Sequence, residues 1–378
     1  MLNVVALDLV QDARLADEIV RAWADGDAIS IIDPRWGADA RRAALESIRP
    51  TVIRSRAGDL AVDGGEECSP GDAAVVLTSG SMSHPKAAVL SHAAIAASAT
   101  MTSDALGVDS DRHRWLCCLP CSHIGGLSVI TRSIITGTDL EVIARPDPSA
   151  LVDAAHHGVT HVSLVTTALR RIDPSLFEVI VLGGAAPPES LPSNVVATYG
   201  MTETGSGVVY RGTPLSGVDL AIVKAGSDGI GEILVRTPTA LRTYRDRPAP
   251  FVVGPDGGDQ WLATGDAGRL DAQGHLEVRG RVAEVIITGG EKVYPGDVES
   301  VLAAMVGVAE VAVWKRPDPE WGERVVAWVV PQGDPPTLAD VRSAVTESLA
   351  AHAAPKELEI VGSLPRTAVG KIRRQDLS

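Results

Sequence analysis

The chain has 378 residues, of which 45% are apolar and 22% charged, and its formal net charge is −14. This length exceeds what one hydrophobic core usually supports, so the sequence predicts two domains, and the balanced composition excludes a disordered or fibrous protein. The acidic balance and the 3% aromatic content argue against nucleic-acid binding. Because there is no basic leader in residues 1–10 and no apolar run near the roughly 20 residues that span a bilayer, we expect a cytoplasmic protein without membrane insertion.

The first part of the chain alternates short apolar runs with Ala-rich helical stretches. Residues 1–72 predict helices at 15–24 and 38–47 and an acidic, Gly-rich surface loop at 63–72. Strand-and-helix pairs then recur, at 74–77 with 90–101, 115–119 with 127–135, and 140–143 with 150–156. Strands that alternate with helices predict an α/β domain whose sheet contains parallel strands.

From about residue 215 the helical pattern stops and short strands crowd together, which predicts a β-rich subdomain. These strands are expected at 220–223, 231–235, 261–264 and 276–278. Beyond residue 280 a βαβ-like unit is predicted, with helices at 297–304 and 338–350 and strands at 308–314, 325–330 and 358–361. We therefore expect a large N-terminal α/β domain at residues 1–281, including the β-rich subdomain, and a small C-terminal α+β domain at residues 282–378.

Three of the four cysteines, Cys117, Cys118 and Cys121, form a C-C-x-x-C cluster, and the fourth is Cys68. Such a cluster can bind a metal or carry redox chemistry. However, the sequence has no second Cys/His pair at metal-ligand spacing to accompany it. We therefore expect buried free thiols.

Two loops have the composition of a nucleotide site. Residues 77–86, LTSGSMSHPK, form a hydroxyl-rich loop expected between a strand and a helix, which can direct N–H groups toward phosphate, with Lys86 adding charge. Residues 199–204, YGMTET, offer a ring for a base and the Glu203 carboxylate for Mg²⁺. Gly183 and Gly184 allow a flat ligand to approach the backbone. Alone, each loop is more simply a polar surface turn.

Two further segments contain residues that could contact a nucleotide. Residues 261–266, WLATGD, and the pair Gly280-Arg281 supply a carboxylate and a guanidinium that suit ribose hydroxyls, although turn chemistry is an alternative explanation. Residues 364–374, LPRTAVGKIRR, project Lys371 from a Gly-bearing loop. By itself, such a lysine is usually only solvated.

Taken together and in this order, the segments resemble the adenylate-forming superfamily of acyl-CoA synthetases, peptide-synthetase adenylation domains and luciferases. The resemblance runs through Thr-Ser-Gly-x-x-x-x-Pro-Lys, His123, Gly-Gly, Tyr-Gly-Met-Thr-Glu, Thr-Gly-Asp, Gly-Arg and Pro-x-Thr-x-x-Gly-Lys, and covers residues 73–374. The closest resemblance is to o-succinylbenzoate–CoA ligases in their short actinobacterial form. It is carried by the short region before Thr78 and by residues 198–218, 288–295 and 353–358.

The resemblance implies an ATP-dependent acid–thiol ligase that forms an acyl-adenylate and then an acyl-CoA thioester, within menaquinone biosynthesis. Its reactants would be ATP with Mg²⁺, coenzyme A and a small carboxylic acid. After pyrophosphate leaves, the small domain would swing about a hinge at Ala283, so that one active site serves both reactions.

The resemblance also implies roles for single residues. Lys371 would bridge the acyl carboxylate and the α-phosphate, Glu203 would hold Mg²⁺, and Thr202 would contact phosphate. His123 would lie between the acyl pocket and the thiol tunnel, although it could instead be a histidine packed at a strand exit. The implied ATP site comprises Thr78, Ser79, Gly80, Ser81, Lys86, Gly183, Gly184, Ala185, Tyr199, Gly200, Met201, Asp266 and Arg281. The implied acyl pocket comprises His123, Gly125, Gly126, Ser163, Thr167, Gly205 and Ser206, and the implied thiol tunnel comprises Gly289 and Gly290.

This sequence departs from the family pattern at several positions. Met82, Ser83 and Ala87 stand where the family's phosphate loop has Thr, Gly and Gly, which predicts a weaker hold on pyrophosphate. Ala283 stands at the hinge, where Asp or Lys is common.

Several alternatives stay open. The chain could be an aryl- or medium-chain acyl-CoA ligase, a stand-alone adenylation enzyme that loads a carrier protein, or a non-catalytic nucleotide-binding relic. Neither acyl-pocket stretch, 161–167 or 204–207, supplies an Arg or Lys for a second carboxylate, so recognition by hydroxyls and ordered water is predicted for such an acid. The oligomeric state, including a homodimer, is also left open.

Overall fold

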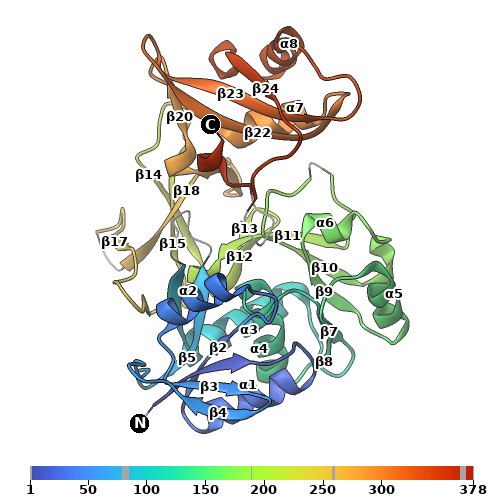
Figure 1. Ribbon diagram of the computed structural model, residues 1–378, viewed down its shortest axis with the longest axis vertical. Coiled ribbons are helices and arrows are strands. Elements are labelled where there is room, and N and C mark those ends of the chain that lie inside the picture. The colour runs from blue at the N-terminus through green and yellow to red at the C-terminus, as the bar shows by residue number, and fades with distance from the viewer. Residues whose placement is uncertain (1, 79–84, 189, 258–259, 367–371, 378) are drawn as a thin grey trace. The chain divides into compact units, whose positions relative to one another are not determined.

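The computed structural model describes residues 2–78, 85–188, 190–257, 260–366 and 372–377. Within these residues the chain has a mixed α/β fold and divides into two compact units (Figure 1). The larger unit is built from the chain up to Ala221 and from Leu234–Leu262 and Ala272–Leu276. The smaller unit is built from Ile222–Ile233, Ala263–Asp271 and the chain from Glu277 onward. The predicted fold class is confirmed.

A seven-stranded sheet in the larger unit has the order β16-β6-β5-β2-β1-β3-β4. Its strands are β1 (Val4–Asp8), β2 (Ala28–Ile31), β3 (Val52–Ser55), β4 (Gly58–Ala61), β5 (Asp72–Thr78), β6 (Lys86–Ser91) and β16 (Thr243–Tyr244). The neighbours among β1, β2, β3 and β5 are parallel, and the outer pairs are antiparallel. Helices α1 (Arg14–Ala24) and α2 (Ala38–Ile48) make the crossovers that parallel strands require.

The segment after β5 departs from the predicted order. The sequence predicts a helix over residues 90–101, but residues 86–91 form β6, antiparallel to β5, and α3 (His92–Leu106) begins only after it. Ser91 caps that helix, since its hydroxyl accepts a hydrogen bond from Ala94 N at 3.1 Å. The predicted helix is present but begins two residues later than expected, and the strand before it was missed, because a short buried apolar run has no periodicity that separates a strand from a helix.

A second seven-stranded sheet in the larger unit has the order β13-β12-β11-β10-β9-β7-β8. Its strands are β7 (Arg114–Cys117), β8 (Asp139–Val142), β9 (His161–Leu164), β10 (Val179–Leu182), β11 (Val195–Met201), β12 (Ser206–Tyr210) and β13 (Thr213–Pro214). The strands from β7 to β11 are parallel, and β12 and β13 add antiparallel strands at one edge. The accompanying helices are α4 (Ile124–Thr136), α5 (Pro148–His156) and α6 (Thr166–Leu169).

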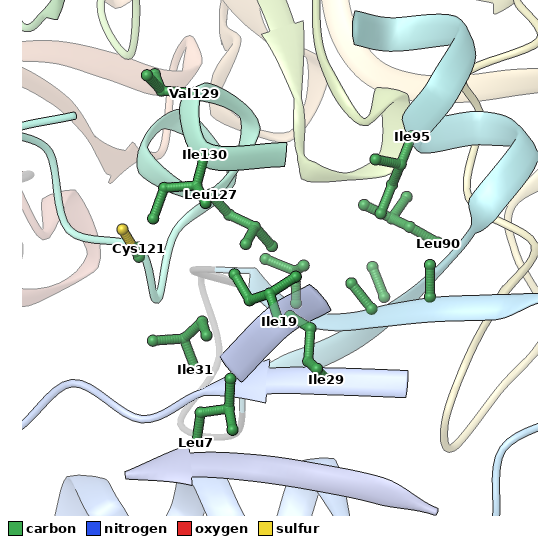
Figure 2. Close-up of a cluster of buried hydrophobic side chains, with 14 of the residues drawn as sticks. Leu7, Ile19, Ile29, Ile31, Leu90, Ile95, Cys121, Leu127, Val129 and Ile130 are labelled. Carbon is green, nitrogen blue, oxygen red and sulfur yellow. The ribbon is translucent and has the colours of Figure 1, made fainter. Parts of the chain in front are cut away.

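Helix α4 is buried along most of its length, and one large core joins it to strands of both sheets. Figure 2 shows Leu127 and Ile130 of α4 near Ile19 of α1, within the cluster that also contains residues of β1 and β2. Trp115 of β7 belongs to the same core. A helix in this position has apolar neighbours on several sides. The one arginine that it carries, Arg132, is therefore buried as well.

The predicted β-rich region forms a third sheet, of order β14-β15-β18-β17, with β19 paired to β18. Its strands are β14 (Asp219–Val223), β15 (Gly231–Arg236), β17 (Phe251–Val253), β18 (Gln260–Leu270) and β19 (Leu276–Arg281). The fourth sheet, in the smaller unit, has the order β21-β20-β23-β22, with β24 paired to β23. It comprises β20 (Ile286–Thr288), β21 (Glu291–Val293), β22 (Val308–Asp318), β23 (Gly322–Pro331) and β24 (Glu357–Ile360).

Helices α7 (Pro295–Ala303) and α8 (Leu338–Ser348) pack on the fourth sheet through a separate apolar core. Strands β23 and β24 are parallel and are joined through α8, as the predicted βαβ pattern requires, whereas β22 and β23 form a long antiparallel pair. In the part of the chain that the structure describes, no helix combines the length and apolar character needed to cross a membrane.

Candidate active site

The predicted phosphate loop joins two antiparallel strands. Strand β5 ends at Thr78 and β6 begins at Lys86, and these two residues are partners across the hairpin. The expectation of a strand-to-helix loop is therefore wrong, and any phosphate contact has to come from N–H groups, hydroxyls and Lys86 rather than from a following helix. Ser79, Gly80 and Ser81 lie outside the described residues, as do Met82 and Ser83.

One of the departures from the family pattern falls in a strand. Ala87 is buried within β6, opposite Leu77. A glycine in the interior of a strand adds backbone freedom without adding a side chain to pack. The presence of Ala87 therefore favours the strand, and its effect on phosphate binding stays a prediction.

Glu203 lies in a short 3-10 turn, η2 (Thr202–Thr204), between β11 and β12. Thr204 is fully buried and holds this turn, because its hydroxyl accepts from Met201 N at 2.9 Å and lies 2.8 Å from the Ser206 carbonyl. Thr239 fixes the turn from outside, donating to the Thr204 carbonyl at 2.8 Å. The backbone of Thr202 and Glu203 is thereby held in place by buried hydrogen bonds.

Tyr244 connects Glu203 with Lys86. The Tyr244 hydroxyl donates to Glu203 Oε1 at 2.8 Å, and Lys86 Nζ lies 5.5 Å from the centroid of the Tyr244 ring, within cation–π range. In the described part of the chain, Glu203 Oε2 has no hydrogen-bond donor. A carboxylate with one oxygen held and the other available suits Mg²⁺, which prefers hard oxygen ligands.

The structure brings the Gly183–Gly184 stretch beside the strand that carries Tyr199. Gly183 N donates to the Leu164 carbonyl at 3.2 Å, and the Thr198 hydroxyl donates to the Leu182 carbonyl at 3.1 Å. A Cβ added to Gly183 would lie 3.2 Å from Thr198 Oγ1. Gly184 has φ +86° and precedes Ala185. The two segments thus lie together as one site requires, while their contact with adenine stays a prediction.

Gly200 is required where β11 meets β12. Their pairing has a bulge after Tyr199, and a Cβ on Gly200 would lie 2.1 Å from the Ser206 carbonyl. Gly205 has φ +64°, and its carbonyl accepts from the Ser98 hydroxyl at 3.2 Å. The glycines of this region therefore permit close backbone approach.

Most of the predicted acyl-pocket residues lie near the N-terminal part of α4. The His123 carbonyl accepts from Gly126 N and Leu127 N at 3.1 and 3.0 Å, so His123 caps the helix. A Cβ on Gly126 would lie 2.4 Å from the Leu119 carbonyl. Gly125 precedes it in α4, and Ser206 Oγ lies 3.4 Å from Ser128 Oγ.

The two remaining predicted pocket residues differ in exposure. Ser163 is buried in β9, and its carbonyl accepts from Cys118 Sγ at 3.5 Å. Thr167, in contrast, is exposed on α6.

In the smaller unit, the two predicted ribose ligands are paired with each other. Arg281 Nε lies 3.0 Å from Asp266 Oδ1, and Arg281 Nη1 donates to the Thr264 carbonyl at 3.0 Å. Gly265 has φ +71°, which turns the backbone between Thr264 and Asp266. The structure therefore pairs a carboxylate of β18 with a guanidinium at the end of β19.

Gly289 and Gly290, with φ +60° and +85°, form the turn between β20 and β21. A Cβ on Gly289 would lie 2.6 Å from the ring of Trp321, so no side chain fits at Gly289 in this arrangement. Ala283 lies in η3 (Val282–Glu284), and Lys371 lies outside the described residues.

All four cysteines are free and buried. The Sγ atoms of Cys117 and Cys121 are 3.5 Å apart, and hydrogen bonding between them together with burial raises the pKa of Cys117 well above its ordinary value. The expectation of buried thiols is confirmed. Within the described ranges, no group of three or more His, Cys, Asp or Glu side chains is arranged to hold a metal ion.

Sequence reasoning misses two residues of interest. Tyr244 lies 41 residues from Glu203, and only the pairing of β16 with β6 brings it near. Arg132 lies within the apolar run 124–136. A charged residue in an otherwise apolar helix is the signal that could have found it.

Two family profiles match the chain. The family described as AMP-binding enzyme matches residues 54–245, and the AMP-binding enzyme C-terminal domain matches residues 297–371. Among curated relatives, the probable 2-succinylbenzoate–CoA ligase of Mycobacterium tuberculosis is 38% identical over 354 residues, covering 87% of this chain and 89% of the relative. The 2-succinylbenzoate–CoA ligase of Enterococcus faecalis is 32% identical, covering 80% and 68%.

The solved structures give a similar result. The o-succinylbenzoate CoA synthetase of Bacillus subtilis in complex with its acyl-adenylate intermediate superposes with a TM-score of 0.86 at 26% identity, over 100% of this chain and 88% of that one. The same protein with ATP and magnesium ion gives 0.85 at 26% identity, over 99% and 89%. The ATP-bound MatB of Rhodopseudomonas palustris gives 0.83 at 21% identity, over 100% and 88%, which shows a shared fold.

Proposed function

Because this chain belongs to the AMP-binding enzyme family, we propose that it is an ATP-dependent acid–CoA ligase whose acid is 2-succinylbenzoate, acting in menaquinone biosynthesis. Two kinds of relatives support the acid. Curated proteins at 32–38% identity bear this name, and a solved structure at 26% identity holds the adenylate of the same acid. ATP and coenzyme A are substrates, and Mg²⁺ accompanies ATP.

The reaction has two steps. In the first, an oxygen of the acid's carboxylate attacks the α-phosphate of ATP, the bond to the β-phosphate breaks, and pyrophosphate leaves. In the second, the thiol of coenzyme A loses its proton and attacks the acyl carbonyl, and AMP leaves. The first step concentrates negative charge on phosphate oxygens, so fixed cations and hydrogen-bond donors supply most of the catalysis.

Residues of the larger unit support the first step. Lys86 and the Thr78 side chain stand at the base of the phosphate hairpin, and Thr202 stands on the buried η2 turn. Glu203 would hold Mg²⁺, which screens the charge of the phosphates. Tyr199 and the stretch Gly183–Ala185 would flank adenine.

Residues of the smaller unit would complete the site. Asp266 and Arg281 would hold the ribose, and Lys371 would bridge the carboxylate and the α-phosphate. We propose that residues 282–378 form the mobile domain and rotate about Ala283 after the first step. The Gly289–Gly290 turn would then line the thiol tunnel, where glycine lets a pantetheine arm approach the backbone closely. His123 would face the thiol from the acyl pocket.

The observation that carries the proposal is the contact chain Lys86–Tyr244–Glu203, which couples the phosphate hairpin to the turn of the predicted Mg²⁺ ligand. The test is pyrophosphate release across a panel of acids that includes 2-succinylbenzoate, with coenzyme A added or withheld. We expect release with this acid and a CoA thioester, detected by mass spectrometry, only when coenzyme A is present.

The alternatives predict different results in the same assay. A carrier-protein loading enzyme would release pyrophosphate but form no CoA thioester. An aryl- or medium-chain ligase would prefer an acid with one carboxylate, and a non-catalytic relic would release no pyrophosphate with any acid. We further propose a cytoplasmic location, consistent with a water-soluble substrate set, and sedimentation would test whether the protein is a homodimer.

A further inference from the structure

The loop that carries His123, residues 118–123, joins the end of β7 to the start of α4. His123 is partly buried, and its N–H donates to the Pro120 carbonyl at 3.1 Å. A loop outside helices and strands depends on side chains from other elements to satisfy its backbone groups and fix its shape. Two such side chains reach this loop from the first sheet, each from a segment that follows a parallel strand.

Gln11 follows β1 and fixes the middle of the loop. Its side-chain amide donates to the carbonyls of Leu119 and Ile143, at 3.0 and 2.9 Å, and its side-chain carbonyl accepts from Cys121 N at 3.0 Å. Ile143 directly follows β8. One glutamine therefore ties the loop to the end of a neighbouring strand, and the backbone on either side of Pro120 cannot shift without breaking these hydrogen bonds.

Asp33 follows β2 and contacts the residue beside His123. Its side chain is only 6% exposed, and Oδ2 accepts a hydrogen bond from the Ser122 hydroxyl at 3.4 Å. Ser122 is also buried. Because β1 and β2 are parallel neighbours, Gln11 and Asp33 leave the sheet at the same edge. They therefore contact two consecutive residues of the loop, immediately before His123.

The Asp33 carboxyl is ionised at neutral pH. Burial opposes its ionisation, but hydrogen bonds from Arg35, whose Nε lies 2.8 Å from Oδ1, lower the pKa of Asp33, and a positive charge on nearby His123 acts in the same direction. Since this attraction is mutual, the carboxylate favours the protonated imidazole of His123. The Arg35 side chain is 49% exposed, so water screens the guanidinium more than it screens the buried carboxylate.

We propose that Asp33 is a positioning residue for thioester formation, which holds His123 through Ser122 and stabilises the imidazole when it takes the thiol proton. This inference rests on the proposed function, in which His123 faces the thiol. The coenzyme A thiol gives its proton to the neutral imidazole, and the sulfur forms a bond to the acyl carbon. The bond between that carbon and the AMP oxygen breaks, and AMP leaves with the electron pair. The imidazolium then gives its proton to water.

The test measures the two half-reactions separately in single turnovers. Adenylation is followed by pyrophosphate release, and thioester formation is followed from supplied acyl-adenylate over a range of coenzyme A concentrations. The variants are D33N, which keeps the side-chain shape without the charge, H123A, and the double variant. D27N is the matched control, because Asp27 is also a buried carboxylate beside β2 but lies at the opposite end, where it accepts from Asn3 N at 2.7 Å.

We expect D33N to slow thioester formation by about tenfold, in its limiting rate rather than in the coenzyme A concentration for half-maximal rate. Adenylation should change about twofold at most. General-base catalysis contributes on the order of 100-fold or more, so H123A should slow thioester formation by a factor of this size. Adding D33N to H123A should then have no further effect, because Asp33 acts through the imidazole. D27N should leave both half-reactions within about twofold of the wild type.

Equal losses in both half-reactions of D33N, or a full additional loss in the H123A background, would overturn the inference and assign Asp33 a purely structural role. If D33N does not fold, S122A takes its place, because this change removes only the hydroxyl that contacts Asp33. A selective loss of thioester formation that disappears in the H123A background supports the inference, and equal losses overturn it. A wild type that releases pyrophosphate but forms no thioester would instead refute the proposed acceptor, and with it the step that Asp33 would assist, before any variant is compared.

Discussion

The hydroxyl of Tyr244 lies 2.8 Å from Glu203 Oε1, joining a strand at the edge of the first sheet to the turn between β11 and β12. Tyr244 is 5% exposed, so this hydrogen bond is protected from water. Its geometry fixes which carboxylate oxygen of Glu203 stays available to a metal ion. Tyr244 is therefore a positioning residue for the proposed Mg²⁺ ligand.

Removing that hydroxyl should weaken the use of Mg²⁺. In Tyr244→Phe the ring still packs near Lys86, but Glu203 loses a hydrogen bond to a charged group, worth about 1.5–3 kcal/mol. We expect the Mg²⁺ concentration for half-maximal pyrophosphate release to rise by roughly tenfold. Tyr210→Phe is the matched control, because the buried hydroxyl of Tyr210 bonds to Thr102 instead. An unchanged Mg²⁺ titration in Tyr244→Phe would refute the positioning role.

Lys371→Ala should separate the two half-reactions. If Lys371 contacts the reacting groups only before the domain rotates, the variant loses adenylation but still forms thioester from supplied acyl-adenylate. Single-turnover assays of each half-reaction measure this. Lys315→Ala is a suitable control, since Lys315 already pairs with Glu323 at 2.9 Å. Equal loss in both half-reactions would contradict the two-conformation mechanism.

The phosphate hairpin offers a gain-of-function test. Replacing Met82 with Thr and Ser83 with Gly restores the residues common in the family. A new charge-assisted hydrogen bond to phosphate, worth about 1.5–3 kcal/mol, should lower the KM for ATP by about tenfold or more. The KM for the acid should not change. Identical ATP dependence in the two proteins would mean that the backbone supplies the phosphate contacts.

Stability at acid pH should depend on His161. Its pKa in the folded protein is about 4, below the ordinary value of 6.5, so the unfolded chain binds more protons between these values. Folding stability contributed by this site is therefore complete above about pH 6.5 and decreases as pH falls toward 4, by about 3 kcal/mol at most. Urea unfolding between pH 4 and 7 should show a shallower decrease in His161→Gln. Parallel curves for the two proteins would exclude His161 as the titrating group.

The alternating pattern predicted most elements of both large sheets, because amphipathic helices and buried strands carry their own periodicity. It failed at residues 90–91, where a buried antiparallel strand lacks such a signal. The motifs pointed to Glu203, Lys86 and the glycines, since nucleotide chemistry demands those residue types. Tyr244 could not be found in this way, because its proximity to Glu203 depends on how a two-residue strand joins a distant sheet edge.

Arg132 is a different kind of omission. Its charge is visible in the sequence, but its surroundings depend on side chains from β7, β9 and β12 that only the folded chain assembles. The spacing of residues along one helix does not show which acidic side chains other elements bring close to it.

The interleaved path of the chain has a practical consequence for domain exchange. Ile230 and Ala267, from the inserted segments 222–233 and 263–271, pack with Tyr294 in one apolar cluster of the smaller unit. A fragment or graft that begins at residue 282 would leave that face of Tyr294 uncovered. A chimera joined at residue 282 would pair its new C-terminal part with Ile230 and Ala267 of the other parent, a contact that the proposed rotation about Ala283 would also have to release.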